Sequence, residues 1–217
     1  DRLEIIVIND ASTDRTGELV ERVASRAPGV RLVLVNVPAE SGARGKAAAL
    51  NRGRQEARHE LLAVYDADNI PEPASLAYLV RQLARHPECA AVLGKFRTVN
   101  RRANLLTRFI NIEGISFQWI VQAGRWMLLR FCSLPGTNYV VRRAALEGAG
   151  GWDEEALTED AELTLRLYQA GWLVKFVPYA VSWEQEPERL ATWLRQRNRW
   201  VRGHNYLFRK FARHVLR

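Results

Sequence analysis

Short apolar runs alternate with amphipathic segments along the first hundred residues of the chain. Four runs have the length and the aliphatic, β-branched composition of buried strands, at residues 3–8, 31–35, 61–65 and 90–94. Three segments between them have helical spacing of apolar residues, at residues 13–26, 46–58 and 74–85. Strands that alternate with helices predict an α/β fold with a mostly parallel sheet flanked by helices.

The second half of the chain begins with a segment of different character. Residues 101–134 predict a pair of amphipathic helices rich in large apolar side chains. These helices either pack on the sheet or lie in a lipid interface, with aromatic residues on one side and arginine on the other. Beyond them we expect a Gly-punctuated loop that feeds a short strand within 134–143 and a helix that begins near Ala144. A helix at 161–170, a strand at 173–177 and a basic helix at 189–217 should follow.

Charge and cysteine content narrow the class of partner. The 217 residues carry a formal net charge of +8, which favours an anionic partner such as nucleic acid, nucleotide phosphates or a membrane surface. The cysteines, Cys89 and Cys132, are far apart in sequence and form no metal or redox motif, so a reducing compartment is the simpler assumption. We see no signal peptide, and no run of about 18 uncharged apolar residues that could span a bilayer alone.

Two carboxylates follow the third apolar run directly. Asp66 and Asp68 are one residue apart, and on an extended chain their side chains point the same way. The carboxyl end of a strand in an open α/β sheet is where ligands bind, and Mg²⁺ is commonly held by one or two carboxylates plus substrate phosphates. An Asx-rich turn is the alternative, because Asp and Asn favour turns.

Three further motifs accompany this pair. Asp10 ends the first apolar run, Gly45-Lys46 precedes a predicted helix, and Thr158-Glu159-Asp160 precedes another, which is followed by Gln196-Arg197-Asn198-Arg199-Trp200. In this order and spacing the motifs resemble the inverting family 2 glycosyltransferases of GT-A (Rossmann-like) fold. The last two resemble the processive membrane branch, the cellulose, hyaluronan, chitin and poly-N-acetylglucosamine synthases.

The resemblance implies a nucleotide-sugar donor, with UDP-N-acetylglucosamine weakly favoured. Asp66 and Asp68 match the family's DxD motif and are expected to bind Mg²⁺ or Mn²⁺ beside the donor diphosphate. Asp10 is expected to contact the base, although it could instead cap the following helix, as could Ser12 or Asp14. Lys46 is expected to meet phosphate at a helix start, or it is a solvated surface lysine.

The resemblance also assigns the acceptor side. Asp160 is expected to be the general base that takes the proton from the acceptor hydroxyl, with Glu159 positioning the loop. The alternative is that both acids complement a helix dipole. Arg199 is expected to hold the diphosphate leaving group. Gly136, Thr137, Gln196 and Trp200 are expected to lie near the sugars; side-chain contact by Asn138 is doubtful because family members often have Gly or Ala there.

The chain departs from the family pattern at its start. GT-A domains begin with a strand and a Pro-x-Tyr-Asn-Glu-like motif, and this sequence starts after it. We therefore expect residues 1–188 to be a GT-A catalytic domain without its first strand, and residues 189–217 to hold the QxxRW helix and a basic membrane-interface helix. The chain is then the soluble part of an integral membrane protein, at the cytoplasmic face of the cell membrane, with a polysaccharide or glycolipid acceptor, membrane lipids and possible accessory membrane subunits as partners.

Three alternatives stay open at this point. A nonprocessive family 2 transferase would add one sugar to a lipid or small acceptor with the same carboxylates. A nucleotidyltransferase on a similar sheet would not need the QxxRW stretch. A basic nucleic-acid-binding module would use the positive charge and interleaved aromatic residues, but acids clustered at strand ends repel phosphates in the absence of a metal. We therefore expect no nucleic acid among the partners.

Overall fold

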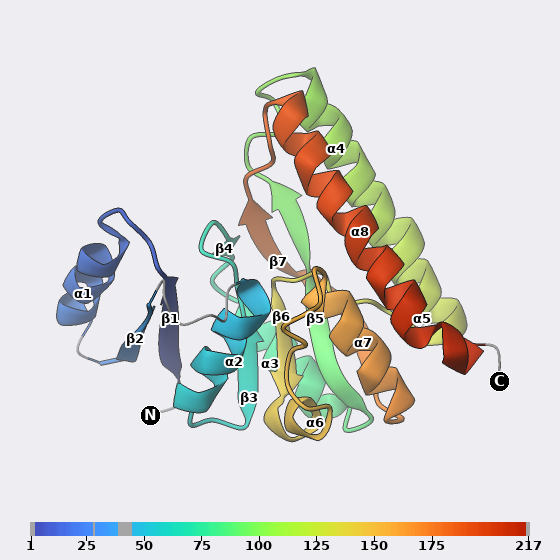
Figure 1. The fold of residues 1–217 in the computed structure, drawn as a ribbon, viewed down its shortest axis with the longest axis horizontal. Coiled ribbons are helices and arrows are strands. Elements are labelled where there is room, and N and C mark those ends of the chain that lie inside the picture. The colour runs from blue at the N-terminus through green and yellow to red at the C-terminus, as the bar shows by residue number, and fades with distance from the viewer. Residues whose placement is uncertain (1–2, 28, 39–44, 216–217) are drawn as a thin grey trace.

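The computed structural model describes residues 3–27, 29–38 and 45–215, with side chains up to residue 212. The strands form two separate sheets, with helices packed around them (Figure 1). The α/β class with a central sheet flanked by helices is therefore confirmed. The last two residues of the expected C-terminal helix lie outside the described part of the chain.

The smaller sheet is a βαβ unit. Strands β1 (Glu4–Asp10) and β2 (Arg31–Val37) pair in parallel over seven residues, and helix α1 (Thr16–Arg26) connects them. The backbone N–H of Thr16 donates to Asp14 at 3.0 Å, so Asp14 supplies the acceptor at the start of this helix. Asp10 stands at the end of β1 and is exposed.

The larger sheet is mixed, which corrects the expectation of mostly parallel strands. Its order is β3 (Leu61–Val64), β6 (Tyr139–Arg142), β5 (Cys89–Thr98), β7 (Leu173–Glu184), β4 (Ile70–Pro71). Within this sheet β5 and β7 run parallel, whereas the pairs β3–β6, β5–β6 and β4–β7 are antiparallel. The strand before Asp66 therefore lies at an edge, because β6 inserts between it and β5.

Helices cover both faces of the larger sheet. Helix α3 (Ser75–Arg85) packs Leu79 and Leu83 on one face, against Val140 of β6. Helix α7 (Glu159–Gln169) packs Leu163 and Leu167 on the opposite face, where helices α2 (Lys46–Glu56) and α6 (Arg143–Gly148) also contribute. Neighbouring residues of β6 point to opposite clusters, as the alternation of a strand requires.

The expected pair of amphipathic helices is instead one continuous helical run. It consists of α4 (Leu105–Ser116), a π-helical stretch η1 (Phe117–Gln122) and α5 (Ala123–Leu129). In the π-helical stretch Gln118 and Gln122 are buried. Gln118 accepts from the N–H of Phe96, and Gln122 bonds both backbone groups of Ser133. The extra residue per turn thus directs two amides inward, where they satisfy backbone groups.

Helix α8 (Leu190–Val215) lies alongside this run (Figure 1). The strands β5 and β7 extend well beyond the expected ranges, and the longer β7 leads directly to α8. Throughout residues 3–27, 29–38 and 45–215, no helix combines the length and apolar character needed to cross a membrane.

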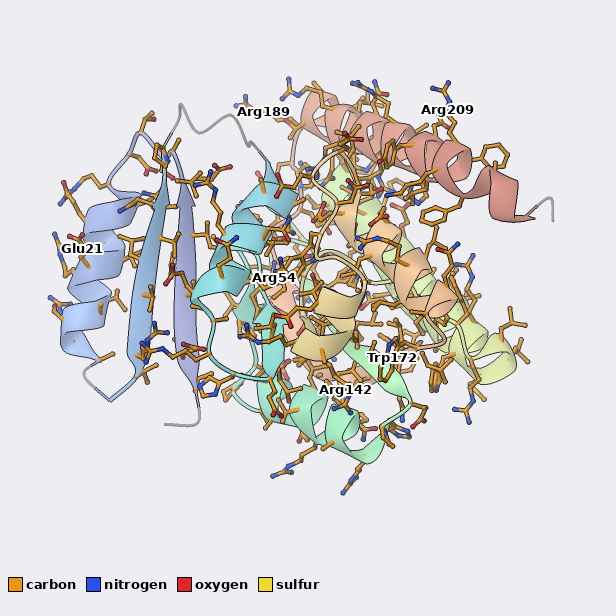
Figure 2. The ribbon with its side chains drawn as sticks, turned by 60° about the horizontal axis from the view of Figure 1, so that its bottom comes forward. Glu21, Arg54, Arg142, Trp172, Arg189 and Arg209 are labelled. Carbon is orange, nitrogen blue, oxygen red and sulfur yellow. The ribbon has the colours of Figure 1, made fainter. Side chains whose placement is uncertain are left out.

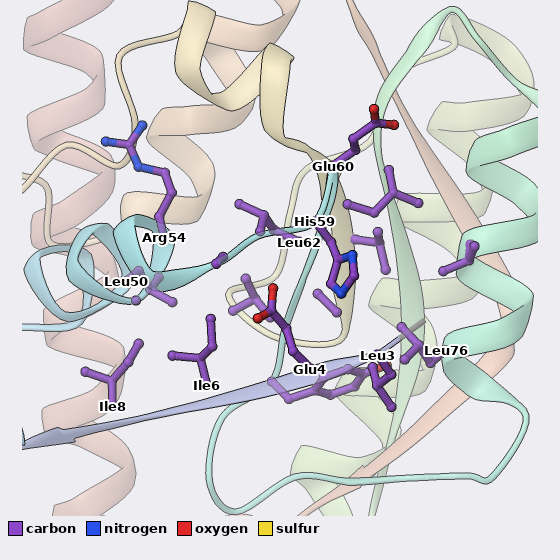
Figure 3. Close-up of a pocket in the computed structure, with 18 of the residues that line it drawn as sticks. Leu3, Glu4, Ile6, Ile8, Leu50, Arg54, His59, Glu60, Leu62 and Leu76 are labelled. Carbon is purple, nitrogen blue, oxygen red and sulfur yellow. The ribbon is translucent and has the colours of Figure 1, made fainter. Parts of the chain in front are cut away.

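An apolar groove separates the two sheets. It faces β1 on one side and β3 on the other, has a volume of about 510 Å³, and is lined by residues that include Leu3, Ile6, Ile8, Leu62 and Leu76 (Figure 3). The strands β1 and β3 are not paired with each other. A GT-A sheet is expected to have one more strand than the chain described here, and we expect its place to be the gap between β1 and β3. This stays a prediction.

Asn138 holds three parts of the larger sheet together. Its backbone has φ 50, and its buried amide donates to the carbonyls of Lys95 at 3.0 Å and Ala180 at 3.1 Å. Gly94 makes room for this amide, because a Cβ there would lie 2.2 Å from the carbonyl oxygen of Ala180 and 2.4 Å from Asn138 Nδ2. Asn138 is thus a structural residue at the centre of the sheet.

We predict that Gly94→Ala lowers the free energy of unfolding by about 1–3 kcal/mol, because the methyl group overpacks the sheet. Asn138→Ala should cost a similar amount, because it leaves two buried carbonyls without donors. Gly124→Ala is the matched control: its Cβ would meet nothing within 4 Å, so the change should be neutral or stabilising. Thermal unfolding of the variants measures this, and equal stability of the two glycine variants would contradict the assignment.

Candidate active site

Lys46 lies at the centre of the candidate site. It is the first residue of α2, after Gly45, whose φ of 102 favours glycine. Its ammonium group lies 2.5 Å from Asp66 Oδ1, 3.8 Å from Glu159 Oε1, and donates to the carbonyl of Gly136 at 2.8 Å. One cation therefore joins groups from β3, α7 and the loop before β6.

Asp66 and Asp68 follow β3 as expected. The backbone N–H of Asp66 donates to the hydroxyl of Thr137 at 3.0 Å, which fixes the start of the DxD turn against the loop before β6. Asp66 is half-buried, and Asp68 is exposed. The Cβ of a residue replacing Gly136, which has φ 85, would lie 3.4 Å from Asp160 Oδ2. The structure thus brings Gly136 and Thr137 close to the carboxylates, and their expected place near the sugars stays a prediction.

Glu159 and Asp160 occupy the first turn of α7, where free backbone N–H groups favour negative charge. Burial, followed by the neighbouring Asp160, raises the pKa of Glu159 to about 7, while Lys46 lowers it in part. Burial also raises the pKa of Asp160, against the opposing effects of the Ala161 N–H, Lys46 and His204. A carboxyl with a pKa of about 7, such as that of Glu159, can bind and release a proton near neutral pH, and the pKa of Asp160 is shifted in the same direction.

Helix α8 packs against this end of α7. A Cβ at Gly203 would lie 2.5 Å from the side chain of Thr158, so glycine allows close contact between the two helices. His204 interacts electrostatically with Asp160, and its Nδ1 lies 2.8 Å from the carbonyl oxygen of Trp200. The Trp200 segment is therefore connected to the acidic turn.

Other predicted site residues are not brought into this cluster. Asp10 is in the smaller sheet, at the carboxyl end of β1. Gln196 and Trp200 are half-buried on α8, and Arg199 is exposed there. Their proposed contacts with donor and acceptor stay predictions, because the hydrogen bonds and ion pairs described above do not include their side chains.

A second pair of acids extends the site and was missed from the sequence. Glu184 is the last residue of β7, Glu186 lies two residues beyond it, and the two side chains share a hydrogen bond. Burial, with contributions from Glu186, Asp68 and Asp66, raises the pKa of Glu184 to about 8. Their i, i+2 spacing at a strand end is the same signal as in the DxD motif, but β7 was expected to end at residue 177.

The carboxylates of the DxD turn fit a divalent cation with ligands completed by substrate. In the part of the chain that the structure describes, no three His, Cys, Asp or Glu side chains form a cluster that could hold a metal alone. Asp66 and Asp68 offer two carboxylates, and Lys46 already places a positive charge against Asp66. This is the donor set that Mg²⁺ or Mn²⁺ uses when phosphate oxygens and water supply the remaining ligands.

Solved structures of other proteins share this fold. A mannosyltransferase of Pyrobaculum calidifontis, solved with GDP-mannose and Mn²⁺, superposes with a TM-score of 0.74 at 26% identity over 99% of this chain and 55% of its own. Staphylococcus aureus TarS, solved with UDP-GlcNAc, superposes with a TM-score of 0.61 at 19% identity over 86% of this chain and 50% of its own, which shows the shared fold.

Two curated proteins of similar sequence have names of glycosyl-transferring enzymes. A probable glycosyltransferase of Bacillus subtilis, YdaM, is 48% identical over 97% of this chain and 50% of its own length. A poly-β-1,6-N-acetyl-D-glucosamine synthase of Staphylococcus aureus is 29% identical over the same shares. The chain therefore spans about half the length of the curated relatives it matches.

The family model for glycosyltransferase-like family 2 matches residues 1–203. With the α/β fold, the DxD turn and the acidic first turn of α7 in place, the chain belongs to the family 2 glycosyltransferases.

Proposed function

We propose that this protein transfers a sugar, with inversion, from a nucleotide diphosphate donor to the growing end of a polysaccharide. The observation that carries the proposal is the meeting of Asp66, Lys46, Glu159 and Asp160 in one cluster. The relatives that act on or bind nucleotide sugars support a UDP-sugar, with UDP-N-acetylglucosamine weakly favoured.

Donor binding follows from the charges of the cluster. Asp66 and Asp68 would hold Mg²⁺ or Mn²⁺, which supplies Lewis-acid stabilisation of the leaving diphosphate. The Lys46 ammonium, 2.5 Å from Asp66, is close enough to turn from that carboxylate toward phosphate oxygen when the metal binds. Asp10 would contact the base, and Arg199 would add positive charge toward the leaving group.

Asp160 would activate the acceptor hydroxyl. An inverting transfer needs one carboxylate to accept the proton of the attacking hydroxyl. Asp160 lies at the start of α7 beside Gly136, where a small residue leaves room for a sugar, and Glu159 holds Lys46 on the other side. Gln196 and Trp200 would form the acceptor end of the site, with Thr137 fixing the DxD turn.

The test is a transfer assay on the full-length protein with labelled UDP-N-acetylglucosamine, UDP-glucose and GDP-mannose, with Mn²⁺ or with chelator. Asp160→Asn should lower kcat by about 10²–10⁴-fold with unchanged donor affinity, because the general base is lost. Glu155→Gln, an exposed acid ahead of the same helix, is the matched control and should keep wild-type activity.

The length of the product distinguishes a polysaccharide synthase from a nonprocessive transferase. A long, metal-dependent polymer from one donor supports the proposal and names the sugar, and addition of a single sugar identifies a nonprocessive transferase. Full activity in Asp160→Asn, or equal activity with chelator, would contradict the assigned base or the assigned metal.

The raised pKa of Glu159 makes stability depend on pH. The carboxyl binds its proton more tightly in the folded state, with a pKa of about 7 against 4.5 when unperturbed. Its contribution is thus complete below about pH 4.5 and is lost as pH rises through about 7. Relative to Glu159→Gln, we expect the wild type to lose up to about 3 kcal/mol of stability between pH 5 and pH 8.

Thermal unfolding of both proteins at the two pH values measures this difference. Glu155→Gln, which removes an exposed carboxylate, should follow the wild type. Parallel pH dependence of wild type and Glu159→Gln would show that the raised pKa is wrong.

We further propose that the helical run and α8 lie against the cytoplasmic leaflet of the cell membrane. Large apolar side chains are exposed along the run, including Phe109 at 61%, Ile120 at 72% and Leu128 at 84%. Such a surface marks an interaction site rather than ordinary solvent-facing surface. Arg209 projects from α8 and Arg189 lies just before its start (Figure 2), and arginines at these places suit anionic headgroups.

We predict that Leu128→Glu weakens binding to vesicles of mixed phosphatidylserine and phosphatidylcholine, because it places a charge in the apolar layer. Leu19→Glu is the matched control, because Leu19 is also exposed but lies on α1, away from the helical run (Figure 1). Co-sedimentation measures binding. Equal loss in both variants, or in neither, would contradict the proposed surface.

A further inference from the structure

Three side chains stack on one another on α8. The stack ends one helical turn before Gly203, the residue at which α8 meets the acidic start of α7. The guanidinium of Arg197 lies 5.3 Å from the ring centroid of Trp193 and 4.5 Å from that of Trp200. Both tryptophans are half-buried, and Arg197 is one helical turn from each. Stacking of this kind suits arginine, whose planar group matches a ring face, and not lysine.

Two acids from other elements face the same guanidinium. Glu113 of α4 receives a two-point ion pair, with Arg197 Nη1 2.7 Å from Glu113 Oε1 and Nη2 bonded to Oε2. Burial raises the pKa of Glu186, which lies beyond β7, and the nearby charge of Arg197 opposes this rise. The two-point pair fixes the plane of the guanidinium, and therefore limits how the rings packed on it can turn.

Of the two rings, Trp200 is nearer along α8 to Gly203, where this helix meets the acidic turn. Its carbonyl oxygen lies 2.8 Å from Nδ1 of His204, which interacts with Asp160, and Gly203 contacts Thr158. A flat ring at this place can stack on a sugar only if its orientation is held before the sugar arrives. Arg197, a residue that the QxxRW pattern leaves unspecified, stacks on this ring and is itself ion-paired to Glu113.

We propose that Arg197, held by Glu113, is a positioning residue that sets the orientation of Trp200 for the acceptor sugar. The inference rests on the proposed function, because it takes Trp200 as the acceptor platform. It deepens that function by assigning acceptor affinity, rather than donor binding or proton transfer, to an ion pair between α4 and α8.

The kinetic test uses the full-length protein, the donor that the transfer assay selects, and mono- and disaccharides of the donor sugar as acceptor probes. Arg197→Met and Trp200→Phe should each raise the acceptor KM by roughly tenfold, and the double variant should be no worse than either. Arg197→Lys should not rescue, because it keeps the charge but loses the planar two-point pair. Slow hydrolysis of the donor without acceptor should be unchanged in the two Arg197 variants.

Arg195→Met is the matched control, because Arg195 is exposed on the same helix and bonds within it to Thr192. Glu113→Gln should reproduce part of the Arg197→Met effect. A second measurement needs no acceptor: the part of the fluorescence that Trp200→Phe removes should become more accessible to acrylamide in Arg197→Met, but not in Arg195→Met.

The outcomes are distinct. A joint fall in kcat, donor hydrolysis and thermal stability in Arg197→Met would show a merely structural role and overturn the inference. Unchanged acceptor KM with unchanged quenching would overturn it as well, while the proposed function would stand. Absence of both transfer and donor hydrolysis in the wild type, with every donor, would instead overturn the proposed function and this inference with it.

Discussion

The contacts of a single ammonium group hold the candidate site together. Asp66, Glu159 and Asp160 come from segments about a hundred residues apart, and crowding buried carboxylates raises their free energy in the ionised form. Lys46 offsets this by pairing with Asp66 and Glu159 while it donates to the carbonyl of Gly136. The start of α2 at Lys46, after a glycine of positive φ, is therefore a requirement of the site and not a local detail.

The same balance explains how a basic protein can have an acidic site. The net charge of +8 is spread over the surface and over α8, whereas the strand ends carry Asp66, Asp68, Glu184 and Glu186. Uncompensated acids repel a diphosphate, so the proposed donor must arrive with a cation that neutralises both sides. Burial raises the pKa of Glu159 and Glu184, so these carboxyls are partly protonated near neutral pH. This limits the repulsion among the acids in the folded protein without its substrate.

Local signals in the sequence predicted the features that short stretches of residues determine, namely single strands, helix starts and motifs. The strand before Asp66 and the helix that starts at Lys46 are present where motif and periodicity place them, while the helix expected from residue 161 begins at Glu159 and so includes both acids. Pairing between distant strands was not predictable from those signals: β6 inserts beside β3 and moves it to the edge, and β7 continues to Glu184 because it pairs with a long β5. The π-helical stretch is accompanied by buried amides of Gln118 and Gln122 that bond the backbone of Phe96 and Ser133, 22 and 11 residues away, beyond the reach of a helical periodicity.

Helix α8 shows why such long-range contacts matter for the site. Gly203 fits it against Thr158 at one turn, and Arg197 ties it to Glu113 of α4 at another, so its position is set from the acidic turn and from the helical run at once. The run also carries the exposed apolar face. A membrane or protein that covers this face would also contact α4. Glu113 of α4 is ion-paired to Arg197, which stacks on Trp200. Placement of the run and geometry of the proposed acceptor end are therefore coupled through one guanidinium.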